Sequence, residues 1–501
     1  MEIPILSLVL FIFSTILFFI IRRRILKTKN SNANAPPGPR KLPLIGNIHN
    51  LVGELPHHAL HHLSQKFGPT MGLQLGETTV VVISSADVAK EIMKTHDINF
   101  ASRPPIITAE IISYGCSSIS FGPYGDHWRQ LRKICTLELL STKRVQSFGW
   151  LRMQVFGDLV KRFASCQDGS AVNFSEEFMS AIYDLISMAV LGEEAKQHDT
   201  LLPNLKEVPQ LSAGFDIAEL FPSVKLFKWM SRLRRRIIAL HEEIDRMFDD
   251  VIHQHRINKT DDDKDLLDVL LKVEQDGLEL PITSENIKAV LVDMLLGGSE
   301  TSSTVMVWAM SEMLKNPRVL QKAQEEVRMV FDQDGSVDES RIPQLNYLKA
   351  VVKETMRMHP PLPLLLPRLS KEACRIQGYE IPADSKIIVN AWTVNRDPKY
   401  WDDPHCFKPE RFMDSLVDYK GNHFQFIPFG AGRRMCPGIT FGLANVEFPL
   451  ALFLYHFDWN LMKHQDLDME EKFGATASRL TDLFLVPVVK RPLPITNLKP
   501  L

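Results

Sequence analysis

The sequence predicts a mainly α-helical protein with small β-sheets, built as one large domain behind an N-terminal membrane anchor. Three observations support this prediction. Helical periodicity of the hydrophobic residues recurs over most of the chain, only a few short segments are β-branched, and no internal repeat divides the 501 residues. The hydrophobic content of 45% is ample for one extended core.

The N-terminal segment has the composition of a membrane span. Residues 3–21 form a charge-free run of mostly Ile, Leu, Val and Phe, and Arg22, Arg23 and Arg24 follow it. About 20 apolar residues span a bilayer core, and flanking cations favour the cytosolic side. No basic segment precedes the run and no small-residue cleavage site follows it, so a retained anchor is favoured over a cleaved signal peptide. We therefore expect a transmembrane anchor over residues 1–21.

A short connecting region is expected between the anchor and the large domain. Residues 22–43 begin with basic residues that stop the membrane span, and they contain the run Pro-Pro-Gly-Pro at residues 36–39. Such a run is stiff and extended and cannot continue a helix. The large domain would then cover residues 44–501, on the cytosolic side of the membrane.

Within the large domain, the patterns predict long helices and short strands. Residues 79–84 and 386–390 read as strands, the first strongly β-branched. Helical periodicity covers residues 145–162, 175–191, 232–255, 284–315 and 318–331.

Charge and cysteine usage exclude several classes of function. The net charge of −2 provides no global field that favours nucleic acid. The six cysteines include no CxxC pair and no histidine at zinc-finger spacing, so reduced thiols are expected. A nucleophile elbow, a P-loop and a HExxH helix are absent. Four histidines cluster early in the chain and are interpreted as a solvated helix face without metal: His57, His58, His61 and His62.

The most informative stretch is residues 429–438, Phe-Gly-Ala-Gly-Arg-Arg-Met-Cys-Pro-Gly. It places Cys436 in a glycine-rich loop before an apolar segment, residues 439–457, that is long enough for a helix. A thiolate there faces the unpaired amides at the start of a helix, which stabilise negative charge. Gly432 and Gly438 would let the backbone pass close to something large and flat. An anionic sulfur presented in this way is suited to be the axial ligand of a haem iron.

The predicted helix over residues 284–315 carries a second motif, Gly-Gly-Ser-Glu-Thr-Ser at residues 297–302. Two adjacent glycines inside a helix cost about 1 kcal/mol each relative to alanine. A groove in which a small ligand lies against the helix would offset this cost. Glu300 and Thr301 would then supply a carboxylate and a hydroxyl beside the groove, which are suited to relay protons.

Both motifs resemble those of the cytochromes P450, the haem-thiolate monooxygenases. The first run fits the pattern Phe-x-x-Gly-x-Arg-x-Cys-x-Gly at every fixed position: Phe429, Gly432, Arg434, Cys436 and Gly438. Residues 297–302 resemble the oxygen-activation motif of that family. The similarity extends from the proline-rich run to residues 484–487 and is greatest to plant microsomal members that oxidise terpenoids.

The resemblance implies the cofactor, the partners and the location. Cys436 would bind the iron of haem b, with Phe429, Gly438 and Gly297 beside the cofactor. Dioxygen would be the co-substrate, and electrons would come from NADPH through NADPH–cytochrome P450 reductase. A basic face with Arg129, Lys133 and Lys143 would receive the reductase. The chain would lie in the endoplasmic reticulum membrane, in contact with lipid.

The resemblance also implies roles for further residues. Thr301 would hydrogen-bond dioxygen at the haem, and Glu300 would help deliver protons. The haem propionates would be held by the family's Trp-x-x-x-Arg motif and two further arginines: Trp128, Arg132, Arg368 and Arg434. Arginine suits this role because its planar fork meets a carboxylate with two hydrogen bonds. A buried network that supports the cysteine loop would consist of Glu354, Arg357 and Arg411.

The expected substrate pocket is apolar. Its walls would come from the helix groove and from residues 106–118, 362–366 and 475–477, with no charge near the reacting centre except Glu300. An apolar pocket binds a hydrophobic molecule and orients it mainly by shape. Residues 215–227, apolar for a loop, would dip into the membrane as an entry route. A sesquiterpenoid or diterpenoid fits best, and an indole alkaloid or phenylpropanoid scaffold stays open.

Two other classes of haem protein are alternatives to a monooxygenase. A haem-thiolate isomerase or dehydratase would rearrange peroxides without a reductase, and relatives of that kind tend to lack the acid–threonine pair. A haem-binding sensor would have no reason to hold a proton relay. The presence of Glu300 and Thr301 therefore argues against both classes.

Overall fold

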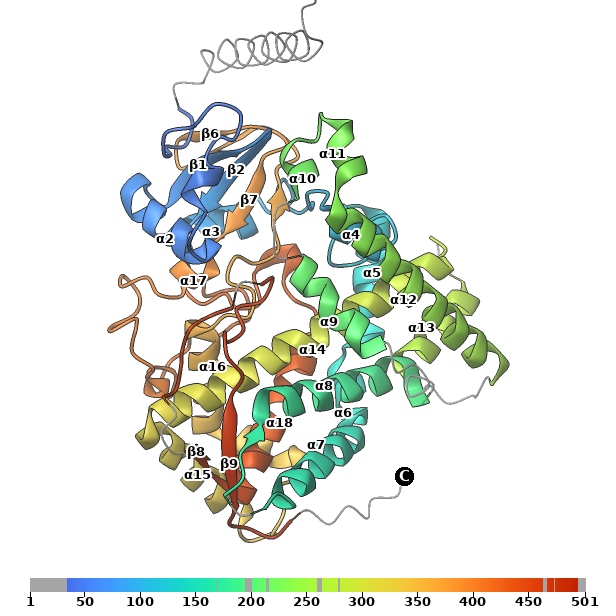
Figure 1. Cartoon of the computed structure of the whole chain (residues 1–501), viewed down its shortest axis with the longest axis vertical. Helices are drawn as coiled ribbons and strands as arrows, with labels where there is room; N and C mark the ends of the chain where they lie inside the picture. Colours follow the sequence, from blue (N-terminus) through green and yellow to red (C-terminus); the bar gives the residue numbers. More distant parts are fainter. Residues whose placement is uncertain are drawn as a thin grey trace, which may run out of the picture.

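The computed structural model describes residues 34–167, 169–193, 201–212, 216–258, 264–277, 280–462, 466–472 and 474–493. The predicted anchor lies outside these residues. The described chain forms a mainly helical body with a β-rich corner (Figure 1), as the sequence predicted. The part of the predicted connecting region at residues 36–39 packs on the first strand, where Gly72 N donates to Pro37 O at 2.8 Å.

Ten longer helices build most of the body among the described residues. They are α2 (Pro56–Phe67), α7 (Gly149–Ala164), α8 (Phe174–Leu191), α9 (Leu201–Leu211), α12 (Arg232–Ile257), α13 (Leu266–Asp276), α14 (Ser284–Lys315), α15 (Pro317–Phe331), α16 (Asn346–Met358) and α18 (Ile439–His456). Shorter helices are α3 (Ala86–Lys90), α4 (Ile107–Ile112), α5 (Asp126–Ile134), α6 (Thr142–Ser147), α10 (Ile217–Leu220), α11 (Lys225–Met230) and α17 (Ala391–Val394).

The strands form three small sheets. The four-stranded sheet has the order β1 (Thr70–Leu75), β2 (Thr78–Ile83), β7 (Lys386–Val389) and β4 (Arg368–Leu369). The three-stranded sheet has the order β3 (Val172–Asn173), β9 (Phe484–Val489) and β8 (Phe457–Leu461), and β5 (Cys374–Ile376) pairs with β6 (Tyr379–Ile381). β2 and β7, the two strands expected from sequence, lie parallel at the centre of the first sheet.

Helix α14 crosses the centre of the body (Figure 1) and matches the predicted segment at both ends. Its N-terminus is fixed by a capping box, in which the Thr283 hydroxyl accepts from Asn286 N and the Asn286 side chain accepts from Thr283 N. Pro317, at the first position of α15, follows its end. α14 packs against α8, α16 and α18, so its side chains face several compartments of the core.

One predicted helix is broken in the structure. The segment over residues 145–162 was expected to be continuous, but α6 ends at Ser147 and α7 begins at Gly149. Phe148 between them is 4% exposed and turns into the core, where its ring contacts Phe441 edge to face. Burying this aromatic ring explains the turn, which periodicity alone did not reveal.

The histidine cluster is not a solvated helix face, so that interpretation was wrong. On α2, His57 is buried, His58 and His61 are partly buried, and only His62 is exposed. The reason is the ring of Trp392 on α17, whose centroid lies 4.7 Å from His58 and 5.2 Å from His61.

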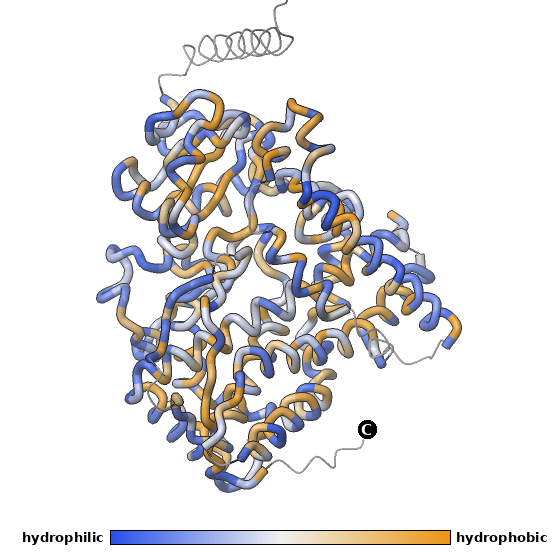
Figure 2. Tube along the Cα trace, in the orientation of Figure 1, coloured by the Kyte–Doolittle hydropathy of each residue, from blue (hydrophilic) through white to orange (hydrophobic). Residues whose placement is uncertain are grey.

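Among the described residues, one helix is long and apolar enough to cross a membrane. It is α18, and two thirds of its apolar window are buried inside the protein. Figure 2 shows this apolar stretch in the interior of the body, beside α14. We therefore assign α18 to the core.

Candidate active site

A cavity lies between α14, α16, α18 and the loop that precedes α18. It encloses about 1490 Å³ of empty space, counting its opening to solvent. Cys436 and Phe429 line it from one side and Gly297 and Thr301 from α14.

Cys436 is held at the base of α18. Its N–H donates to Phe429 O at 3.0 Å, and Gly438 is the residue directly before the helix. Burial raises the pKa of the Cys436 thiol, whereas the Gly438 N–H and the charge of Arg132 act in the opposite direction. The loop therefore supplies groups that stabilise a thiolate, although burial outweighs them in the protein alone.

Glycine is needed at the two loop positions for different reasons. Gly432 has a φ of +70°, and a Cβ there would lie 2.0 Å from Met93 O. Gly432 is therefore required because the backbone of Met93 lies close to it. The expectation that Gly432 adjoins something large and flat does not hold. Gly438 lines the cavity, so for this glycine the expectation stands.

The paired glycines of α14 also differ. A Cβ on Gly297 would meet nothing within 4 Å, because this position faces the cavity. A Cβ on Gly298 would lie 3.2 Å from Ile186 Cδ1 of α8. One glycine leaves room in the cavity, and the other permits close helix packing. The helix stays continuous through both.

Four arginines converge on the cavity: Arg103, Arg132, Arg368 and Arg434. Arg368 pairs with Asp97, with 2.9 Å between Nη1 and Oδ1, and the others donate to backbone carbonyls. Burial, together with the charges of Arg368 and Arg132, lowers the pKa of Arg434 to about 9. Burial and the other three arginines also lower the pKa of Arg103, which the sequence analysis missed because no motif marks it.

Trp128 lies beside this group but not in the cavity wall. Its Nε1 donates to Ile119 O at 2.9 Å, and the Arg434 guanidinium stacks over its ring at 4.1 Å. The indole N–H, expected on a propionate, is therefore bound to backbone here. In this geometry Trp128 supports Arg434.

The structure brings Glu354, Arg357 and Arg411 together. Arg357 Nε and Nη2 donate to the two oxygens of Glu354 at 2.7 and 2.8 Å, and Arg411 Nε donates to Oε1 at 3.0 Å. Arg357 Nη1 also donates to Asn395 O and Pro404 O. The network ties α16 to the segment of residues 395–411, and Glu354 and Arg357 are fully buried.

The acid and the hydroxyl of α14 face different compartments. Thr301 lines the Cys436 cavity, and its Oγ1 donates to Gly297 O at 2.8 Å. Glu300 lines a second, polar cavity, where its Oε1 accepts from Thr476 Oγ1 at 2.6 Å. Burial raises the pKa of Glu300, and the Thr476 hydrogen bond and the charge of Lys472 partly offset this. The expectation that both groups line one groove is thus corrected.

Asp293 is a second site residue that sequence reasoning missed. It lines the Cys436 cavity one helical turn before Gly297, so the spacing along α14 was the signal. Its Oδ2 accepts from Ser120 N at 2.9 Å. Burial raises the pKa of Asp293 to about 6, although hydrogen bonds from Ser120, Ser118 and Ile119 act against this. The cavity therefore holds a carboxyl group where none was expected.

The remaining walls agree only partly with the prediction. Leu362, Leu365 and Leu366 line the Cys436 cavity as expected. From the loop after α4, however, Ile119 and Ser120 contribute instead of residues 106–118. Ala475 and Thr476 line the second cavity, on the side of Glu300.

The charge balance of the cavity tests whether a haem fits. Four arginines face Asp97 and Asp293, so the cations exceed the carboxylates by two. Buried charges are normally paired, and a haem carries two propionates. Cys436 lines the same cavity and would bind the iron, and the apolar residues of the lining suit a porphyrin. The residues present fit the group.

A cavity with these features defines a haem-thiolate protein. The Cytochrome P450 family model matches residues 36–485, so the chain belongs to the cytochrome P450 family. The family implies a haem, and the chain is accordingly a monooxygenase that receives electrons from a reductase.

Comparison with known proteins agrees with this assignment. The chain is 70% identical to salviol synthase of Salvia pomifera over 500 residues, covering 99% of this chain and 100% of that protein. It is 48% identical to premnaspirodiene oxygenase of Hyoscyamus muticus (96% and 98% covered) and 45% identical to tabersonine 6,7-epoxidase isoform 2 of Catharanthus roseus (94% and 96% covered). A zebra fish cytochrome P450 structure with abiraterone shares the fold, with a TM-score of 0.73, 24% identity, and 87% and 99% covered.

Proposed function

We propose that this monooxygenase oxidises a hydrophobic terpenoid, a sesquiterpenoid or diterpenoid, with electrons from NADPH delivered by NADPH–cytochrome P450 reductase. The observation that carries the proposal is the largely apolar wall of the Cys436 cavity, formed by Leu362, Leu365, Leu366 and Val305. Similarity to salviol synthase and premnaspirodiene oxygenase, both terpenoid oxidases, supports the substrate class.

In this proposal, Cys436 would bind the haem iron through its sulfur. Arg132, Arg368 and Arg434 hold the propionates, with Arg103 as a fourth cation. When bound, the haem supplies the activation of dioxygen and the oxidation of the substrate. The Glu354–Arg357–Arg411 network supports the loop that carries Cys436.

The side chains of α14 handle protons. Thr301 holds its hydroxyl toward the cavity through the hydrogen bond to Gly297 O. Glu300 exchanges protons with the polar cavity behind the helix, and the bond from Thr476 keeps its carboxyl in place. The two residues are adjacent on one helical turn, although their side chains face different cavities.

We also propose that the catalytic body sits on the endoplasmic reticulum membrane, on the cytosolic side, with residues 1–21 as anchor and 22–43 as connector. A patch of exposed apolar side chains on α10, α11 and their connection supports this: Ile217, Val224, Leu226, Trp229 and Met230. α10 and α11 lie at the same end of the molecule as the four-stranded sheet (Figure 1), and their hydrophobic residues are visible in Figure 2. Exposed Arg129, Lys133 and Lys143 would receive the reductase.

A second candidate substrate class rests on Asp293. A carboxylate at the wall of an apolar cavity pairs well with a protonated amine, and tabersonine 6,7-epoxidase is among the relatives. An indole alkaloid would use this carboxylate, whereas a terpene hydrocarbon would not.

A spectral titration of the ferric protein tests the proposal. Binding of a substrate displaces water from the iron and shifts the haem towards high spin. We expect saturable shifts with terpenoids and none with indole alkaloids. Shifts with alkaloids alone, lost in Asp293→Asn, would replace the first candidate by the second. Turnover with reductase and NADPH then identifies the product.

A further inference from the structure

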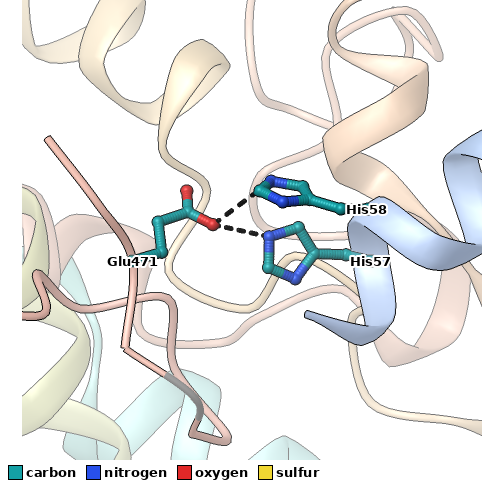
Figure 3. A group of neighbouring side chains, drawn as sticks. All are labelled: His57, His58 and Glu471. Atoms are coloured by element: carbon teal, nitrogen blue, oxygen red, sulfur yellow. Dashed lines mark hydrogen bonds and ion pairs between the residues drawn. The ribbon is translucent and has the colours of Figure 1, made fainter. Parts of the chain in front are cut away.

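A group of side chains remote from Cys436 has the composition of a metal site. His57 and His58 are consecutive on α2, and Glu471 comes from the segment before the polar-cavity residues at 474–476. Figure 3 shows both imidazoles directed at the same carboxylate oxygen. His57 Nε2 lies 2.6 Å and His58 Nε2 3.5 Å from Glu471 Oε2, and one ligand atom from each residue lies within 4.8 Å of the others.

A third imidazole adds an independent observation. His359, just after α16, is 7% exposed, and its Nδ1 has no hydrogen-bond partner among the described residues. That nitrogen lies 3.8 Å from Glu471 Oε1, beyond hydrogen-bond reach. Stacking on Trp308 at 3.9 Å and the contact of Nε2 with Glu312 Oε1 at 2.8 Å fix the ring. A buried nitrogen without a partner is costly, and a metal ion would satisfy it.

The charges around the cluster also require a cation. Glu471 and Glu312 are both buried. The guanidinium that faces them is Arg396, which packs over the Trp392 ring at 4.0 Å and donates to Met358 O. A second buried guanidinium, Arg479, lies over the Trp308 ring and donates to Ser311 Oγ and Thr481 O. With neutral imidazoles, no lysine or arginine among the described residues therefore forms an ion pair with Glu471 or Glu312. Since buried charges are paired or bound to metal, the missing cation is either a proton on an imidazole or a metal ion.

We propose that His57, His58 and Glu471 bind a divalent transition metal ion, best matched by zinc, with His359 as the fourth ligand. Imidazole nitrogens and carboxylate oxygens bind zinc at about 2.0–2.2 Å in tetrahedral sites. Metal ligands bind as neutral imidazole and carboxylate, so zinc binding is expected to weaken at low pH.

The site has a structural consequence. Glu470 O and Lys472 N bond to Leu480 and Ser478, so the segment around Glu471 is the base of a hairpin. The tip of this hairpin carries Thr476, the partner of Glu300. A metal ion would therefore fasten the hairpin to α2 and fix the wall of the polar cavity.

The test uses full-length holoenzyme purified without a histidine tag. Calorimetric titration with ZnCl2, and metal analysis after dialysis, should find one zinc per chain in addition to the haem iron. His58→Gln, at a partly exposed position, should weaken zinc binding by at least about tenfold, the smallest loss typical of a perturbed metal site. His62→Gln changes an exposed histidine of the same helix and should bind zinc like the wild type. MgCl2 should not compete, because magnesium prefers oxygen ligands.

Two results would overturn the proposal. Equal zinc affinity in the wild type, His57→Gln and His58→Gln would place the ion elsewhere. No zinc binding at all would identify the cation as a protonated imidazole. The reduced carbon monoxide spectrum of each variant reports the integrity of the haem site, so a folding failure is recognised separately. Failure of the zinc proposal would leave the proposed monooxygenase function unaffected.

Discussion

The two faces of α14 make different environments from adjacent residues. One face carries Asp293, Gly297 and Thr301 into a cavity whose wall is mainly apolar and whose cations exceed its acids. The other carries Glu300 and Thr304 into a cavity lined by Ser, Thr, Lys, Glu and Arg side chains. The helix separates the mainly apolar cavity of Cys436 from a polar cavity.

This difference explains how protons and substrate are kept apart. An apolar wall excludes water, which protects reactive species and strengthens the electrostatic interactions inside. A proton relay needs the opposite, a titratable group in contact with polar neighbours. By placing Thr301 and Glu300 side by side in sequence, α14 supplies each environment with its own group, about 100° apart around the helix axis.

The largest effect is expected from removing the thiolate of the first face. Cys436→Ser should abolish turnover and the thiolate-type spectrum of the reduced carbon monoxide complex, because serine oxygen is a poor substitute for an anionic sulfur ligand. Difference spectroscopy of the purified protein measures this. Cys406→Ser, at an exposed cysteine, is the matched control and should keep both. A thiolate-type spectrum in Cys436→Ser would make another cysteine the ligand.

A pair of threonines compares the two faces directly. Thr301→Ala should lower product formation by up to about 10²-fold, the lower end of general acid–base contributions, while haem binding stays intact. Electrons should then appear as hydrogen peroxide. Thr304→Ala, on the polar face, removes a buried hydroxyl that has no partner among the described residues and should change little. The ratio of product to NADPH consumed is the measurement. An equal ratio of product to NADPH in the two variants would mean that the two faces of α14 do not differ in their role in proton transfer.

The polar face is tested through its titratable group. Glu300→Gln keeps the shape and the contact with Thr476 but cannot exchange a proton, so we expect slower turnover and a larger solvent isotope effect. The raised pKa of Glu300 keeps its protonated form populated to higher pH than for an exposed glutamate. Wild-type turnover should therefore fall as pH rises through that pKa, and this component should be missing in Glu300→Gln. An identical pH profile in Glu300→Gln would assign proton delivery elsewhere.

A feature of the fold could be predicted from sequence when the residues that cause it lie in the same segment. α14 was placed correctly because its cap, its periodicity and Pro317 lie within the segment itself. The loop of Cys436 was recognised for the same reason. Phe148 broke a predicted helix because its partner, Phe441, is almost 300 positions away in the chain.

The site shows the same division. The ion pairs of Glu354 and Arg357 follow from spacing along one helix. The partners of Trp128, Glu300 and His57 are set by tertiary packing: Ile119 O, Thr476 and Glu471. Sequence spacing cannot tell on which side of α14 a neighbouring compartment is polar, so Glu300 was expected in the wrong cavity.

The smallest effect concerns Asp293, the acid of the apolar face. Burial raises its pKa from 3.8 to about 6, so the folded protein holds this proton more tightly than the unfolded chain. Its contribution to the free energy of unfolding is therefore greatest below pH 4, falls as pH rises towards 6, and is constant above. The free energy of unfolding of Asp293→Asn should therefore rise relative to that of the wild type as pH increases across that interval. Denaturant titration of the holoenzyme at several pH values measures this. Asp250→Asn, at an exposed position of α12, is the control. A stability difference between Asp293→Asn and the wild type that does not change with pH would mean that Asp293 titrates like an exposed carboxyl, and that the apolar face is wetter than its lining indicates.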